Sequence, residues 1–309
     1  MVQVKGKNIV IGMDNSFSMI RFNDVRVSSK VWAPGEESLS KILEKYYVPL
    51  SAESVKRLKE MLNVPDKLVK RCAGAVTAAI LTFDDMLRSK IGNLFSVFFF
   101  NDDVWPDREN RELAIFKTTE EDAPEAIIAM LDYGLNCRGG TNLSGAIQRG
   151  VELAEMMIDE NQVKPVIFVL ISDAAPYEKS GDTPEKFLKT VKDLLGERRD
   201  IHLNCISIGK NAHHDLFKEA ADITGGKNLA LSSPDLSQIT KWIKELYSDV
   251  GSKPSVKSRI ISRGFKCPNC GKKTDKTGIC SNCGWKICSK CGKASSPESR
   301  FCSNCGSPL

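Results

Sequence analysis

The chain has 309 residues, of which 41% are hydrophobic and 27% are charged, enough to bury a full core in two domains or in one large α/β unit with a small module. No run approaches the roughly 18–20 apolar residues that cross a bilayer, which excludes a transmembrane helix. The net charge of +5 is unevenly distributed along the chain. Residues 252–309 hold 12 Lys and Arg and 2 Asp and Glu, whereas the rest of the chain holds 32 Lys and Arg and 37 Asp and Glu.

The N-terminal segment predicts a buried strand that ends in candidate metal ligands. Residues 1–6 lead directly into an apolar run at 8–13, leaving no room for a signal peptide, so we expect an intracellular, cytoplasmic protein. Such a run is typical of a strand buried on both faces of a parallel sheet. Asp14, Ser16 and Ser18 follow, and their oxygens suit Mg²⁺, although Ser and Asp are also common in turns and at helix N-caps.

An insertion of about residues 20–65 follows this motif. Apolar spacing predicts helices over 36–47 and 51–62, and a longer helix over 66–90 that lies against the sheet. Placed beside the candidate ligands, the insertion either forms a partner surface or simply covers an edge of the sheet.

The rest of the large region alternates between strands and helices. This alternation predicts an α/β fold with a doubly wound, mostly parallel sheet. The predicted strands are 94–100, 114–117, 166–173, 201–208 and 229–231, and the predicted helices are 121–133, 143–158, 185–195, 214–223 and 236–247.

Two of these junctions add candidate ligands. The glycine-rich turn at 138–143 presents the hydroxyl of Thr141 just before a helix, and the buried strand at 166–173 ends in Asp173. In open α/β sheets, ligands bind at the carboxyl ends of the strands. Three strand-to-loop junctions therefore present a single set of hard oxygen ligands, which are Asp14, Ser16, Ser18, Thr141 and Asp173.

In sequence order these five residues resemble the metal-ion-dependent adhesion site (MIDAS) of von Willebrand factor A (vWA) domains: D-x-S-x-S, then Thr, then Asp. The resemblance spans roughly residues 7–249. It implies a Rossmann-like vWA domain that holds Mg²⁺ or Mn²⁺ at the five residues and leaves a coordination position for a partner's Asp or Glu. Asn15, Phe17 and Ala174 depart from the commoner family pattern, and the bulky Phe17 narrows the approach to the metal.

The C-terminal region predicts two structural zinc sites. A Ser-, Gly- and Lys-rich linker at 250–264 leads into a module at 265–309 with four C-x-x-C pairs. The module resembles a double zinc ribbon, and it is short enough that metal binding must supply its folding free energy. Because the cysteines are evenly split into pairs, zinc is favoured over an iron–sulfur cluster. One site is Cys267, Cys270, Cys280 and Cys283, and the other is Cys288, Cys291, Cys302 and Cys305.

These features predict an intracellular adaptor or regulatory protein rather than an enzyme. The resemblance implies that residues 1–249 form a vWA domain that binds a partner carboxylate through Mg²⁺, and we expect the zinc ribbon to be a second interaction module. A nucleic-acid-associated protein that uses the basic tail is an alternative, although Phe265, Trp285 and Phe301 are the tail's only candidate stacking groups. A metal-dependent hydrolase is a second alternative, but the site offers no obvious separate general base.

Overall fold

The computed structural model describes residues 7–21, 23–26, 39–49, 68–90, 92–105, 114–173 and 182–249, and in the C-terminal region residues 270, 282–283, 285–287, 294–297 and 299. The chain divides into two compact units, Met1–Tyr247 and Ser248–Leu309. The helix predicted over 51–62 and the linker at 250–264 lie outside the described residues.

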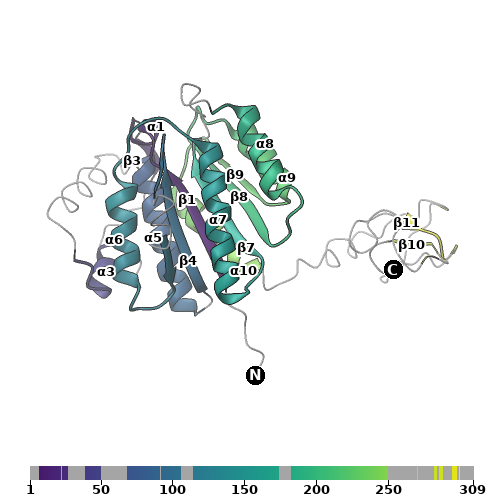
Figure 1. The fold of residues 1–309 in the computed structure, drawn as a ribbon, viewed down its shortest axis with the longest axis horizontal. Helices are drawn as coiled ribbons and strands as arrows, with labels where there is room; N and C mark the ends of the chain where they lie inside the picture. Colours follow the sequence, from purple (N-terminus) through teal and green to yellow (C-terminus); the bar gives the residue numbers. More distant parts are fainter. Residues whose placement is uncertain are drawn as a thin grey trace. The chain divides into compact units, whose positions relative to one another are not determined.

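A seven-stranded sheet forms the centre of the larger unit, in the order β5-β4-β1-β7-β8-β9, with β6 also paired to β4 (Figure 1). Five consecutive strands of this sheet run parallel, which confirms the predicted α/β fold with a mostly parallel sheet. These strands are β4 (Gly92–Phe100), β1 (Lys7–Asp14), β7 (Val166–Ser172), β8 (Ile201–Ile208) and β9 (Asn228–Leu231). The short strands β5 (Val104–Trp105) and β6 (Ile115–Lys117) pair with β4 antiparallel.

Helices cover both faces of the sheet. The buried core on one face joins the strands to α7 (Leu143–Asn161), α8 (Pro184–Leu195) and α9 (His214–Thr224). On the other face lie α5 (Arg71–Ser89), α6 (Ala123–Gly134) and α10 (Leu236–Asp249). Within the described ranges, no helix has the length and apolar character of a bilayer span.

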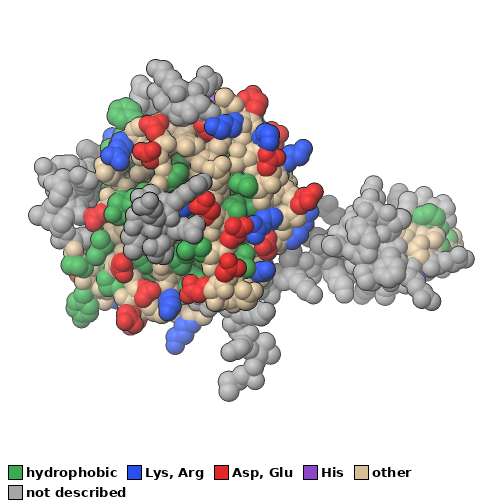
Figure 2. All heavy atoms as spheres, viewed as in Figure 1, with side chains coloured by type: hydrophobic (Ala, Val, Ile, Leu, Met, Phe, Trp, Pro, Cys, Tyr) green, Lys and Arg blue, Asp and Glu red, His purple; other side chains and the backbone are tan. Residues whose placement is uncertain are grey.

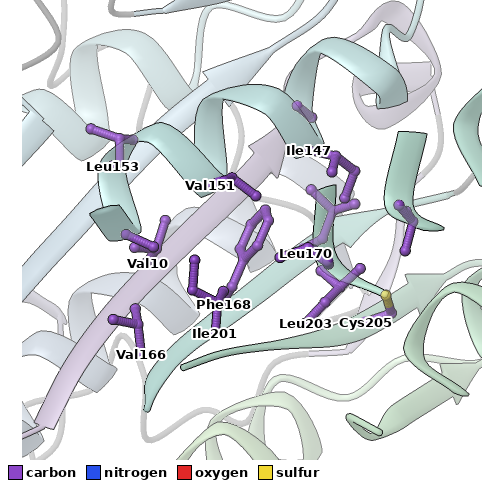
Figure 3. Packing of buried hydrophobic residues seen from close by; sticks show 14 of the residues in the cluster. Val10, Ile147, Val151, Leu153, Val166, Phe168, Leu170, Ile201, Leu203 and Cys205 are labelled. Carbon is purple, nitrogen blue, oxygen red and sulfur yellow. The ribbon is translucent and has the colours of Figure 1, made fainter. Parts of the chain in front are cut away.

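The core beneath α7 is built from strand side chains that lie on the same face of the sheet (Figure 3). Val10, Phe168 and Leu203 come from neighbouring strands and are buried in one cluster with Ile147, Val151 and Leu153 of the helix. Gly150 allows α7 to approach this closely, because a Cβ at that position would lie 2.0 Å from the Cζ atom of Phe168. The apolar runs of the sequence therefore became the strands that position the candidate ligands.

The long helix predicted over 66–90 is wrong at its N-terminal end. Residues Leu68–Lys70 form strand β3, which pairs antiparallel with β2 (Asn23–Arg26), and α5 begins only at Arg71. Leu68 and Val69 fit a helical apolar stripe, but a segment as short as Leu68–Lys70 fits a strand equally well. Its pairing with β2, which is distant in the sequence, makes it a strand. The remaining described helices of this part are α1 (Phe17–Arg21) and α3 (Leu39–Lys45).

In the smaller unit, strands β10 (Lys286–Ile287) and β11 (Ala294–Ser295) pair antiparallel. Lys286 Nζ also donates to the carbonyl of Ser299 at 3.1 Å. In the sequence, Cys288 and Cys291 fall between these two strands, and both lie outside the described residues.

Candidate metal centre

The predicted acidic ligands lie where the strand order of the sheet reverses. From β1 the chain passes to β4 on one side, and it later crosses to β7 on the other side of β1. Open α/β sheets bind ligands outside the carboxyl ends of the strands at such a reversal. Asp14 ends β1 and Asp173 follows β7, so the two carboxylates flank this point.

Hydroxyl groups surround the Asp14 carboxylate. Ser172 Oγ donates to Asp14 Oδ2 at 2.5 Å, and the backbone N–H of Ser16 donates to Oδ1 at 2.7 Å. Ser16 Oγ lies 3.0 Å from Ser18 Oγ. Each carboxylate oxygen can accept more than one bond, so Asp14 retains acceptor capacity for a metal ion or for a water bound to it.

Two backbone hydrogen bonds join the Thr141 turn to the loop after β1. The N–H of Phe17 donates to Gly139 O at 3.0 Å, and the N–H of Arg138 donates to Asn15 O at 2.8 Å. Gly139 has φ +66°, in the left-handed region that favours glycine. These contacts place Thr141, which is buried, beside the D-x-S-x-S loop.

The start of α7, just after Thr141, is fixed by two acceptor side chains. Asn142 Oδ1 accepts from Gly145 N at 2.8 Å, which makes Asn142 the N-cap. Asp182 Oδ2 accepts from Leu143 N at 2.7 Å. Sequence reasoning missed Asp182, because it reaches this helix from 39 positions further along the chain.

The two carboxylates repel each other. Burial raises the pKa of Asp14 to about 7, repulsion from Asp173 adds to this shift, and hydrogen bonds from Ser16 and Ser172 oppose it. Arg71 Nη1 lies 3.3 Å from Asp173 Oδ2, and both side chains are buried. No sequence pattern indicated a role for Arg71, which begins α5 and lies 102 positions before Asp173.

The chemistry of this set fits a hard divalent cation. Two carboxylates and several hydroxyl groups are the oxygen ligands that Mg²⁺ and Mn²⁺ prefer. Among the residues that the structure describes, no three His, Cys, Asp or Glu side chains gather, so the set depends on its hydroxyl groups. The structure brings Asp14, Ser16 and Ser18 into one hydrogen-bonded cluster, with Asp173 and the Thr141 turn beside it.

Aromatic side chains lie near this cluster. Phe17, between the two candidate serine ligands, is 62% exposed. Tyr133 is 41% exposed and stacks on Trp105, and its carbonyl accepts from Asn15 Nδ2 at 3.3 Å. The sequence predicted a bulky Phe17 beside the site, but not the Tyr133–Trp105 stack.

In the smaller unit, two of the predicted zinc ligands are described. Cys270 Sγ lies 3.5 Å from Cys283 Sγ, too far for a disulfide bond between them. Thiolates that share a tetrahedral Zn²⁺, with Zn–S distances of about 2.3 Å, lie about 3.8 Å apart, so this pair fits one zinc site. The other six predicted ligands lie outside the described residues: Cys267, Cys280, Cys288, Cys291, Cys302 and Cys305.

Comparison with known families places a zinc-ribbon domain at the C-terminus. The zinc-ribbon domain family matches residues 287–309, which contain the second predicted set of four cysteines. No curated protein sequence matches the chain.

Three solved structures resemble the chain at low sequence identity. The conserved hypothetical protein BatB from Bacteroides thetaiotaomicron is 13% identical, with 80% of this chain and 100% of that chain covered and a TM-score of 0.46. The PilB minor pilin from Streptococcus sanguinis is 12% identical, with 81% and 62% covered and a TM-score of 0.48. The pilus adhesin SpaC from Lactobacillus rhamnosus GG is 13% identical, with 80% and 31% covered and a TM-score of 0.49.

Proposed function

We propose that this chain is a metal-dependent protein-interaction protein, with an adaptor or regulatory role rather than an enzymatic one. The observation that carries the proposal is the pair of buried carboxylates at the strand-order reversal, with the Ser16 and Ser18 hydroxyls 3.0 Å apart beside it. In this proposal the cluster holds Mg²⁺ or Mn²⁺, which binds an Asp or Glu side chain of a protein partner. The ligands are Asp14, Ser16, Ser18, Thr141 and Asp173.

Elementary electrostatics supports this reading. A hard dication pairs with an anionic oxygen, and the attraction is stronger in a partly desolvated site than in water. The zinc ribbon acts as the second interaction module. We also propose a cytoplasmic setting, where reducing conditions keep the cysteines available as thiolates for zinc.

The direct test is a calorimetric titration of the full chain with Mn²⁺, combined with affinity capture in Mg²⁺ and in EDTA. We expect the wild type to bind one ion at this site and to retain a partner only in Mg²⁺. The Asp14→Ala variant should lose both properties. A wild type that takes up no divalent ion here, even with a carboxylate present, would refute the proposal.

Phe17 is expected to contribute to partner affinity without holding the metal. An exposed aromatic side chain beside a bound carboxylate can pack on the partner, so Phe17→Ala should weaken partner binding by about 2 kcal/mol, or roughly 30-fold. Its Mn²⁺ affinity should stay within about twofold of the wild type, because the variant keeps both serine hydroxyls. Calorimetry with the captured partner measures the first effect, and the Mn²⁺ titration measures the second.

Tyr47→Ala is the matched control, because Tyr47 is 89% exposed and lies beyond α3. Its partner affinity should equal that of the wild type. Equal losses in Phe17→Ala and Tyr47→Ala would show that the effect is not specific to the metal site.

Nucleic-acid binding through the basic tail is the alternative, and we expect it to fail a salt titration. Two zinc sites with four thiolates each lower the formal charge of residues 252–309 from +10 to +6. On the face shown in Figure 2, acidic and basic side chains are interspersed over the larger unit. Titration of the zinc-loaded full chain with DNA and RNA should show only weak binding at physiological salt. Tight binding with a slope of about −0.9 per phosphate contact would favour the alternative.

The hydrolase alternative needs a base that removes a proton from a bound water in addition to the metal. Hydrolysis of a generic phosphoester by the full chain, dependent on Mn²⁺ and lost in Asp14→Ala, would favour it over the interaction role.

A further inference from the structure

A buried arginine contacts one of the two candidate acidic ligands. Arg71 Nη1 is 3.3 Å from Asp173 Oδ2, and the two side chains are only 3% and 6% exposed. A charged pair is expensive to remove from water, so burial at the edge of a binding site calls for a specific explanation. Helix α5 begins at Arg71 itself, so the guanidinium is carried at the first position of a long helix.

The backbone at the end of β8 is shaped around this guanidinium. Gly209 follows β8 with φ +112°, and a Cβ there would lie 2.0 Å from Arg71 Nη2 and 2.2 Å from Cζ. Glycine is the residue that both adopts this positive φ readily and leaves room for the guanidinium, so any other residue would force the arginine to shift. The N–H of Gly209 donates to Leu231 O at 2.8 Å, and the N–H of His213 donates to Asp173 O at 3.1 Å. The turn after β8 therefore holds both partners of the ion pair.

The charge of the cluster changes sign when a divalent ion binds. Asp14, Asp173 and Arg71 together carry a single negative charge when both acids are ionised. When a divalent cation is added to these three groups, their net charge becomes +1. Without Arg71, the two carboxylates and the cation would have a net charge of zero. Since Arg71 contacts Asp173 directly, its charge acts on any cation that Asp173 helps to hold.

We propose that Arg71 is a built-in counter-cation that weakens the affinity of the free chain for the metal and gives the metal-loaded site a net positive charge. One carboxylate neutralises that charge. Metal and carboxylate therefore bind cooperatively, and by linkage each raises the affinity of the site for the other by the same factor. This inference rests on the proposed function and specifies its regulation: a metal ion is retained best when an anionic partner is present.

The test measures Mn²⁺ affinity of the full, zinc-loaded chain at pH 8, with and without acetate as the simplest carboxylate. Arg71→Gln removes the charge and keeps a hydrogen-bond donor for Asp173. We expect this variant to bind Mn²⁺ at least about tenfold more tightly than the wild type without acetate, and to gain less affinity when acetate is added. Arg71→Lys keeps the charge and should stay near the wild-type affinity.

Arg198→Gln is the matched control. Arg198 also pairs with carboxylates, those of Asp200 and Glu155, but it precedes β8 at the opposite end of the sheet. An eight-residue strand separates the two arginines by about 26 Å, so this control should keep wild-type Mn²⁺ affinity and the full acetate effect.

Equal or weaker Mn²⁺ binding by Arg71→Gln would overturn the inference and leave Arg71 as a purely structural residue. If near-UV circular dichroism shows that this variant does not fold, the test rests on the acetate dependence of the Mn²⁺ affinity of the wild type. A wild-type Mn²⁺ affinity that acetate does not raise, after correction for acetate complexes in the buffer, overturns the inference as well. A wild type that binds no Mn²⁺ under either condition refutes the proposed function itself, whereas uncoupled binding refutes only the role of Arg71.

Discussion

Replacing Asp14 with asparagine is expected to raise the melting temperature of the metal-free protein at pH 8 and to abolish its stabilisation by Mg²⁺. Burial, with repulsion from Asp173, raises the pKa of Asp14 to about 7 from an ordinary value of 3.8. The ionised carboxylate is therefore unfavourable in the folded chain unless a cation is bound. Asparagine removes the charge and keeps an oxygen that can accept from Ser16 N.

The pH dependence of this effect has a definite sign. The folded state binds the Asp14 proton more tightly than the unfolded chain does, so the associated stability is fully present below about pH 4 and is lost as the pH rises through 7. At about 1.4 kcal/mol per pH unit, the loss is on the order of 4 kcal/mol at pH 8. This loss corresponds to a melting temperature that is roughly 8–16 °C lower for a domain of this size, as an upper range.

Thermal melts of the EDTA-treated wild type and of Asp14→Asn at pH 5 and pH 8 measure the effect. The difference between the two proteins should be on the order of 4 kcal/mol at pH 8 and less than half of that at pH 5, where the unfolded chain already ionises Asp14 but the folded chain does not. Asp193→Asn is the matched control, because Asp193 is an exposed residue of α8 that pairs with Lys189, and its effect should be small at both values. A difference that does not grow between pH 5 and pH 8 would contradict the raised pKa of Asp14.

Asp173→Asn is expected to behave differently in the same melts. It also removes a candidate ligand and should abolish the response to Mg²⁺. However, it breaks the buried ion pair with Arg71, so we expect no stabilisation of the metal-free form. Asp14 and Asp173 resemble each other in the sequence, because each follows a buried strand. The structure shows that their surroundings differ, since only Asp173 is paired with Arg71.

The fold and the main ligand positions could be predicted from the sequence because they depend on local patterns. The apolar runs at 9–13 and 166–171 became the buried strands β1 and β7, and the segment at 201–208, where apolar residues alternate with His202, Asn204 and Ser207, became β8. Because the carboxyl ends of parallel strands lie at one edge of a sheet, Asp14 and Asp173 were expected at the same edge, and the pairing of β1 with β7 brings them together. The turn at Gly139 was visible for the same reason, as glycine marks a required backbone conformation.

The features that the sequence did not reveal all depend on pairing over long distances. Arg71 lies inside the helix predicted over 66–90, and nothing local relates it to Asp173 or to Gly209. Asp182 is one acidic residue among many until α7 is placed above it. The short strand β3 was hidden in a helical pattern, because its partner β2 lies more than 40 positions earlier.

Zinc removal is expected to unfold the C-terminal unit and to leave the larger unit folded. A module of this size cannot bury an adequate core, and zinc contributes roughly 10–16 kcal/mol of apparent folding free energy to comparable small domains. Mass spectrometry under native conditions should find two Zn²⁺ per chain. Cys270→Ser and Cys283→Ser should each lose the first ion, since these two thiols lie 3.5 Å apart.

Cys302→Ser should lose the other ion, which the zinc-ribbon match at 287–309 predicts for the second set of cysteines. Cys137→Ser is the control, because Cys137 lies in the larger unit near the candidate metal centre, and it should keep both ions. Asp14→Asn should also keep both, since the predicted zinc sites share no ligand with the candidate metal centre. A single zinc per wild-type chain, or iron in its place, would contradict the pairing of eight cysteines into two sites. A loss of both ions in Cys270→Ser would instead show that the two sites fold as one unit.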